Sequence, residues 1–460
     1  IPVADEFDAT HLSVKNITID ANHINIIGDT IHGQVTHLTA LERCGLMIKE
    51  MKAKVTVSPN ASICDNLYLE TNHSKVHHYY AMLYKRFPDF TSYITNVTMV
   101  AHLNDAVVDE RDVAYFAPLL RRYPTVVHVS GDGRGTVANL SGQHMLVTDG
   151  NTLIKGNFSM KGLPDIYKTL IEFQDGEIAT TGAGILRYAP SLRNNPNLAL
   201  ERLSYVYFKG NYTGYIENFA VNGILSTNLG SVTSNVKMNI PGFSSNKAVY
   251  SGTILSDHFN LGALLRQPEL GTLTLKADIN GMSFDPEHAQ IKTDATVSDL
   301  DIHGYHYKNI FAEGTLARKQ FTGKLLVDDT NLALAFYGTI DYSQKMLSIN
   351  AKANLLKSNF YNLHLTKDTI EAVADFDLNC TASNIDNFLG TAKLYNIDVK
   401  RNLRRLNLDS VNVSSAINGN EKQLTVQSND ITASITGNYT LSKLPYSVQY
   451  YLSGYLPNYI

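Results

Sequence analysis

The segment Thr272-Leu273-Thr274-Leu275-Lys276-Ala277-Asp278-Ile279 decides the fold class of this chain. Leucine, alanine and isoleucine take every second position, and threonine, lysine and aspartate take the positions between them. Because successive side chains of a β-strand point to opposite faces, this alternation predicts a strand with one apolar and one polar face. The same alternation recurs from about residue 156 onward, with short turn segments such as residues 328–331 between the strands. The sequence therefore predicts a mostly β protein built as an antiparallel meander.

The composition indicates a folded protein with no preference for nucleic acid. The chain has 460 residues, of which 44% are hydrophobic and 18% charged, and its net charge is -4. Disordered chains are richer in charge and poorer in apolar residues, and a nucleic-acid partner needs a basic surface. No apolar run approaches the length that crosses a bilayer. The chain starts without a methionine or a signal peptide, so we expect a piece of a longer protein or a processed form.

Three cysteines, Cys44, Cys64 and Cys380, are too few for a disulfide scaffold. A Cys44–Cys64 bridge and three free buried thiols remain alternatives at this point.

Helical patterns are confined to the first 175 residues. Residues 109–122, with Val113, Phe116 and Leu120 at helical spacing, predict an amphipathic helix that caps the sheet. Residues 77–87 and 165–171 are shorter candidates. Prolines interrupt the pattern near residues 187–197 and again near 241–246. We place the boundary at the first of these, which gives a β-rich segment with short helices over residues 1–190 and a continuous β-groove over residues 191–460.

The search for chemistry finds no catalytic or metal-binding pattern. His303 and His306 are three residues apart, which places them on opposite faces of a strand. The glycines of residues 131–136 lack the ending of a phosphate-binding loop and predict a hairpin turn. We therefore predict a protein that is not an enzyme and has no metal or cofactor, although acid and base residues far apart in sequence would escape this search.

A long meander with one apolar face must cover that face, and the sequence offers no large set of amphipathic helices after residue 175. We therefore expect the sheet to curl on itself into a U-shaped groove, open along one side. About 20 to 30 strands at roughly 4.8 Å spacing would reach on the order of 100 Å. The same alternation also suits a sandwich or barrel whose apolar faces pack together.

Several phrases of the sequence resemble the TamB branch of the AsmA-like proteins, particularly its Bacteroidota-type members. The resemblance lies in the order of these phrases and covers most of residues 100–355. The phrases are residues 112–120, 131–137, 155–166, 207–214, 229–232, 259–262, 321–323 and 328–332.

The resemblance implies a protein of the periplasm of a Gram-negative bacterium that acts in outer-membrane biogenesis. Such a protein bridges the inner and outer membranes and conducts phospholipid along an apolar, taco-like β-groove. It implies an inner-membrane anchor, here outside this chain, and an outer-membrane partner of the Omp85 type. The family's C-terminal docking domain is not recognisable here. The residues that we predict to line the groove are Leu273, Leu275, Ile279, Leu332, Leu334, Phe336, Leu347 and Ile349.

Two other functions remain as alternatives. A scaffold would pair its exposed sheet edges with strands of outer-membrane protein clients or of an Omp85-type partner. A surface adhesin or carbohydrate-binding protein would use exposed tyrosine platforms, for which the tyrosine clusters of residues 205–215 and 446–459 are the support.

Overall fold

The computed structural model describes residues 5–8, 11–118, 121, 125–418 and 421–454. Strands account for 64% of the chain and helices for 13%, which confirms the mostly β fold. The chain divides into two compact units, residues 1–238 and 239–460, and each is described by itself. The division falls close to the seam predicted at residues 241–246.

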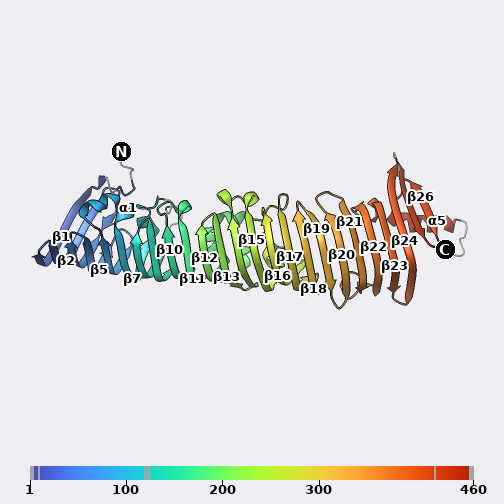
Figure 1. Ribbon diagram of the computed structural model, residues 1–460, viewed down its shortest axis with the longest axis horizontal. Helices are drawn as coiled ribbons and strands as arrows, with labels where there is room; N and C mark the ends of the chain where they lie inside the picture. Colours follow the sequence, from blue (N-terminus) through green and yellow to red (C-terminus); the bar gives the residue numbers. More distant parts are fainter. Residues whose placement is uncertain (1–4, 9–10, 119–120, 122–124, 419–420, 455–460) are drawn as a thin grey trace. The chain divides into compact units, whose positions relative to one another are not determined.

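In the first unit, strands that follow one another in the chain lie side by side (Figure 1). They pair in the antiparallel direction, as in β1–β2, β4–β5 and β12–β13. The strands are β1 (Val14–Ile27), β2 (Thr30–Glu42), β3 (Met47–Ile48), β4 (Glu50–Ser58), β5 (Ala61–Glu70), β6 (Lys75–Leu83), β7 (Thr98–Asp109), β8 (Val126–Thr136), β9 (Asn139–Thr148), β10 (Leu153–Lys161), β11 (Leu170–Thr180), β12 (Val206–Tyr215), β13 (Asn218–Thr227) and β14 (Gly230–Asn239). The helical segments are η2 (Phe87–Ser92), α1 (Tyr93–Asn96), α2 (Glu110–Val113), η4 (Ile166–Lys168), α3 (Gly182–Tyr188), η5 (Pro190–Asn194) and η6 (Leu200–Arg202).

The second unit repeats this arrangement, and its described strands form an open ladder in which β26 pairs only with β25. The strands are β15 (Val249–Asn260), β16 (Leu270–Met282), β17 (Gln290–Ile302), β18 (Tyr305–Ala317), β19 (Gln320–Asp328), β20 (Leu332–Asp341), β21 (Leu347–Ser358), β22 (Ile370–Ala382), β23 (Leu389–Arg401), β24 (Arg404–Asn418), β25 (Glu421–Ser428) and β26 (Thr432–Gly437). The helical segments are η7 (Pro241–Phe243), η8 (Ser245–Lys247), α4 (Leu261–Leu265), η9 (Ile385–Asn387), η10 (Leu441–Lys443) and α5 (Leu444–Ser453). Short helices therefore also occur well after residue 175.

Bulges within the strands bend the sheet of each unit. Asn66, Asp105, Asp175 and His258 have positive φ angles in the middle of their strands, and the pairing register shifts at each of them. A bulge adds one residue to one strand, which bends that strand and increases its twist. Asn, Asp and His tolerate the left-handed conformation better than most residues do. These bulges explain how a sheet of long strands curls without closing into a barrel.

The strand ladder continues through the boundary predicted near residue 190. Strands β11 and β12 pair directly, from Ile171 with Gly214 to Thr180 with Val206. The proline-containing residues between them form α3, η5 and η6, a helical insertion at one end of two paired strands.

Two predictions about local structure are wrong. Residues 77–87 lie mostly in β6, whose His and Tyr side chains suit a strand that pairs with β5 and β7. The glycine-rich residues 131–136 do not form a hairpin turn, because they lie within β8, where Gly133 pairs with Ala101 and Gly142.

Candidate functional site: an apolar sheet face

The central feature of the second unit is a face on which four neighbouring rows of side chains carry no charge. Residues paired across antiparallel strands lie on the same face, so the registers define each row. The first row is Ser256, Leu275, Val297, Ile310, Val327, Leu334, Leu355 and Ala374, and the second is Ile254, Ala277, Ala295, Ala312, Leu325, Phe336, Ala353, Phe376, Leu394, Val411 and Ser428. The third is Gly252, Ile279, Thr293, Gly314, Gly323, Gly338, Ala351, Leu378, Ala392, Val413, Val426 and Ala433, and the fourth is Tyr250, Gly281, Ile291, Leu316, Phe321, Ile340, Ile349, Cys380, Gly390, Ser415, Leu424 and Ile435.

The opposite face of the same strands is mostly polar, with Phe311, Leu326 and Ala335 as an apolar run on it. One row of this face lies between the second and third apolar rows and consists of Thr253, Asp278, Asp294, Glu313, Lys324, Tyr337, Lys352, Asp377, Lys393, Asn412 and Gln427. The two faces therefore differ sharply in charge, and water solvates only one of them well.

The apolar face is packed most closely around Phe336. Phe336, Ala351 and Ala353 are buried, and Phe321, Leu325, Leu334, Ile340, Ile349 and Phe376 pack against them. Most other side chains in the four rows are only partly buried, which leaves apolar surface accessible along the face. Such a surface can contact a second apolar molecule without unfolding the sheet.

All eight predicted lining residues lie on the apolar face of their strands. Leu275, Ile279, Leu334, Phe336 and Ile349 belong to the four rows. Leu273, Leu332 and Leu347 are in phase with them on β16, β20 and β21 but lie beyond the rows, nearer the strand ends. Leu273 pairs with Phe259 and Leu300, so its surroundings are also apolar. Whether these side chains contact lipid stays a prediction.

Sequence reasoning placed Ala277 on this face but missed the glycines that make the face smooth. The third row contains Gly314, Gly323 and Gly338 on β18 to β20, and the second contains Ala277, Ala295 and Ala312 on β16 to β18. Their strand phase relative to neighbouring leucines is the signal that would have found them. A search for large apolar side chains passes over such positions.

The first unit has an apolar cavity of its own, with a volume of about 340 Å³. Strands β9 to β13 form it, and its lining is Met145, Val147, Ile154, Gly156, Phe158, Met160, Ile171, Phe173, Ile178, Phe208, Tyr212 and Val221. The hydroxyl of Tyr212 donates to the carbonyl of Tyr215 at 2.9 Å. Burial raises the pKa of Tyr212 above its usual value. The cavity is lined by apolar surface.

Aromatic rings in this cavity lie over glycines of their own or a neighbouring strand. A Cβ atom built on Gly142 would lie 2.3 Å from the ring of Phe158, and one built on Gly176 would lie 2.0 Å from the ring of Phe173. Both distances are far shorter than any carbon–carbon contact, so only glycine allows the rings to lie there.

The predicted capping helix is wrong in extent. Helix α2 covers only Glu110–Val113, and Leu120 lies outside the described residues. Val113 ends the helix half-buried, and Phe116 lies beyond it, 56% exposed, with its ring 5.0 Å from that of Phe7. These positions therefore do not form one amphipathic helical stripe.

Polar contacts of Asp112 fix this segment instead. The buried carboxylate accepts hydrogen bonds from the hydroxyl of Thr71, from the backbone N–H groups of His73 and Ser74, and contacts Nδ1 of His73 at 2.9 Å. Burial alone would raise the pKa of Asp112, but these hydrogen bonds outweigh burial and hold the pKa below its usual value.

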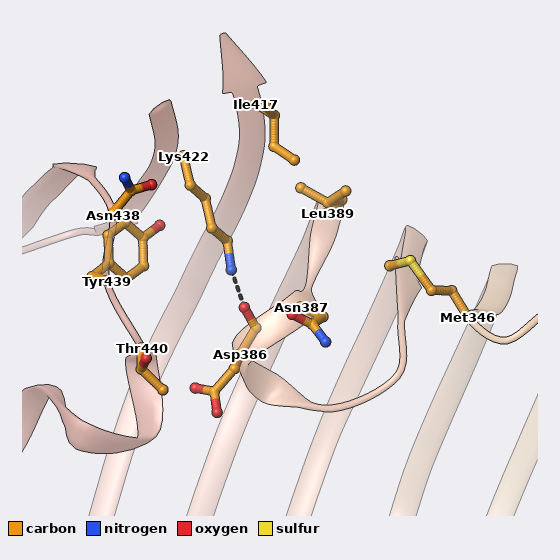
Figure 2. A pocket seen from close by; sticks show the side chains of 9 residues that line it. All are labelled: Met346, Asp386, Asn387, Leu389, Ile417, Lys422, Asn438, Tyr439 and Thr440. Atoms are coloured by element: carbon orange, nitrogen blue, oxygen red, sulfur yellow. Dashed lines mark hydrogen bonds between the residues drawn. The ribbon is translucent and has the colours of Figure 1, made fainter. Parts of the chain in front are cut away.

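A second pocket, of about 450 Å³, lies in the second unit where the loops of β22–β23 and β26 meet β24 and β25 (Figure 2). Met346, Leu389 and Ile417 supply apolar surface, and Asn387, Asn438 and Thr440 supply polar groups. Lys422 extends into it, donates a hydrogen bond to the backbone carbonyl of Asp386, and lies 5.3 Å from the centroid of the Tyr439 ring.

The cysteines and histidines form no reactive centre among the residues described. All three cysteines are free, so the Cys44–Cys64 bridge is absent from the structure. Cys380 lies in the fourth apolar row, and burial raises the pKa of its thiol. Within the described ranges, no three His, Cys, Asp or Glu side chains converge as metal ligands. No helix there has the length and hydropathy needed to cross a bilayer.

Comparison of the chain with protein-family models, with curated proteins and with solved structures found no match.

Proposed function

We propose that this chain is a TamB-like lipid conduit that binds phospholipid acyl chains on the apolar face of its bent sheet. The observation that carries the proposal is the set of four uncharged rows in the second unit, backed by a charged opposite face. The apolar cavity of the first unit supplies a second surface of the same chemistry.

The energetics favour acyl chains over other ligands. Each methylene moved from water to an apolar wall contributes about 0.8 kcal/mol, so a bound chain gains stability in proportion to its length. The headgroup stays in water at the open side of the sheet. Small side chains such as those of Gly323 and Ala312 leave few obstacles between neighbouring strands, which suits movement along the face. Such movement makes and breaks no covalent bond, so the proposed function is not enzymatic.

The resemblance to the TamB branch supports the proposed setting. We place the protein in the periplasm of a Gram-negative bacterium, in outer-membrane biogenesis, with an Omp85-type protein as its outer-membrane partner. This setting rests on the sequence phrases alone.

Transfer of fluorescent phospholipid between donor and acceptor vesicles tests the proposal. The parent chain should accelerate transfer, and Leu334→Arg should abolish the acceleration because a cation would interrupt the first apolar row. Leu326→Arg is the matched control, since Leu326 lies on the adjacent strand and pairs with Ala335 on the opposite face. Equal transfer by both variants would refute the assigned face.

A second candidate function is a strand-pairing scaffold, which the first strand favours. All 14 residues of β1 are exposed, and among the described strands β1 pairs with β2 alone. Ile17, Ile19, Ile24 and Ile26 are each more than half exposed. Such an edge suits β-augmentation by a client strand. Capture of an unfolded outer-membrane protein should then be lost in Ile19→Pro and survive in Leu334→Arg, and the reverse result would exclude this function.

A further inference from the structure

We propose that the pocket around Lys422 binds the anionic headgroup of an amphiphile whose aliphatic chain lies on the apolar rows. This inference rests on the proposed function, because it assigns to the apolar face a polar end that selects the ligand. The shared chemistry is a phosphate or carboxylate joined to a hydrocarbon chain.

The position of Lys422 on the sheet carries the inference. In β25, Lys422 lies two residues from Leu424, a member of the fourth apolar row, and therefore on the same face. It pairs with Ile417 of β24 and Gly437 of β26. The four rows contain no Asp, Glu, Lys or Arg, so the lysine places a positive charge directly at the margin of an uncharged face.

Among the residues that the structure describes, Lys422 forms no ion pair with a carboxylate. Other lysines, such as Lys209 with Glu177 and Lys400 with Glu371, form ion pairs. Lys422 donates a hydrogen bond to the backbone carbonyl of Asp386 and makes a cation–π contact with the ring of Tyr439, and neither contact neutralises the ammonium charge. An ammonium group has three N–H donors, so two remain for a ligand.

The carboxylate of Asp386 is held in another direction. It accepts hydrogen bonds from the backbone N–H of Ser442 at 2.7 Å and from the hydroxyl of Ser442 at 2.8 Å. These bonds, with a smaller contribution from the charge of Lys422, lower the pKa of Asp386. Figure 2 shows the carbonyl of Asp386 pointing at Lys422 and its carboxylate turned away. The space beside the ammonium is thus open to an external anion.

The other walls match the two ends of an amphiphile. Asn438 and Thr440 lie on the side of Tyr439, whose buried hydroxyl has no hydrogen-bond partner within the described chain. Ile417, which is 57% exposed and in phase with Ser415 of the fourth row, lies on the side of the apolar rows, and Leu389 adds apolar surface to the pocket. A volume of about 450 Å³ falls within the range of small-molecule pockets. A compact ammonium suits a phosphate as a point charge.

Photolabelling tests this assignment. The probes are decyl phosphate and decanol, each with a diazirine at the chain end, and peptic digestion followed by mass spectrometry locates the label. In the parent chain, decyl phosphate should label peptides of β23 to β26. Its half-saturation concentration should lie roughly tenfold or more below that of decanol, because only the phosphate accepts a charge-assisted hydrogen bond. Unlabelled decyl phosphate should compete, and inorganic phosphate at the same concentration should not.

Three variants separate a ligand contact from a structural clamp. Lys422→Met keeps the aliphatic stem and should raise the half-saturation concentration of decyl phosphate to that of decanol. Lys422→Arg keeps the charge and should retain the preference. Lys393→Met removes the same charge from the polar face and should change nothing. The comparison of the two probes on the parent chain needs no variant and holds if Lys422→Met fails to fold.

Each outcome decides one claim. Equal labelling by both probes, or an unchanged preference in Lys422→Met, overturns the headgroup site and leaves the apolar face as a lipid surface. Full competition by inorganic phosphate overturns the amphiphile and indicates a site for free anions. Failure of both probes to label the chain overturns this inference together with the proposed function.

Discussion

Replacing Phe336 with alanine should weaken the sheet far more than the same change at its neighbour Tyr337. Phe336 is 8% exposed and lies at the centre of the packed cluster, between Leu325 and Ala353 on the flanking strands. Buried Phe→Ala changes cost about 3 to 5 kcal/mol. We expect the lower end, about 3 kcal/mol, because neighbours of this ring such as Leu325 and Leu334 are themselves only partly buried.

Tyr337 is the matched control on the same strand. It points to the polar face, is 47% exposed, and its ring lies 5.8 Å from Nζ of Lys324. An exposed cation–π contact contributes about 0.5 to 1 kcal/mol, so Tyr337→Ala should cost no more than that.

Native-state hydrogen exchange measures both variants locally, which suits a long ladder whose strands need not unfold together. A loss of about 3 kcal/mol corresponds to a fall in protection of roughly 150-fold for the amides of β19, β20 and β21. Tyr337→Ala should lower protection by about fivefold or less. If Tyr337→Ala lowered protection as much as Phe336→Ala, the assignment of the packed face would be refuted.

Three further predictions follow from local geometry. Gly176→Ala should destabilise β10 to β12 by about 1 to 3 kcal/mol because its Cβ would overlap the Phe173 ring. Gly133→Ala should be nearly neutral in the same exchange experiment, because its Cβ would lie 4.0 Å from the Cβ of Ala101. The pKa of Asp112 is lower in the folded protein than in the unfolded chain, so its carboxylate stabilises the fold above the unfolded pKa of about 4 and loses this effect as the pH falls through the folded pKa. Asp112→Asn should therefore flatten the acid limb of a plot of stability against pH. An unchanged plot would contradict the hydrogen-bond assignment. Cys380 should react slowly with iodoacetamide at pH 7 because burial raises the pKa of its thiol. Bound decyl phosphate should slow this alkylation further, which peptide mass spectrometry would measure. Equal rates of alkylation with and without decyl phosphate would place the ligand elsewhere.

The strand pattern was predictable because period two is a local property of the sequence. Leu275 and Ile279 could be assigned to one face from their spacing alone, and the registers place them in the first and third rows of that face. The meander was also predictable, since short turns leave few ways to connect adjacent strands.

Other features depend on contacts between distant residues and could not be predicted in this way. The segment after Asp109 reads as a helix, yet Thr71, His73 and Ser74 hold Asp112 from a turn about 40 positions earlier. The glycines of β8 read as a turn because the sequence does not show which ring or strand approaches them. Lys422 is an intermediate case: its phase with Leu424 and Val426 is visible in the sequence, but the pocket needs the loop of Asp386 and the ring of Tyr439.

Mass spectrometry of lipid that copurifies with the chain, prepared from a bacterial envelope without detergent, tests the central claim most directly. We expect phospholipid to be bound to the parent chain and to Leu326→Arg, and to be lost from Leu334→Arg. A parent chain free of lipid, with both variants equally free, would contradict the lipid conduit and direct attention to the exposed edge of β1.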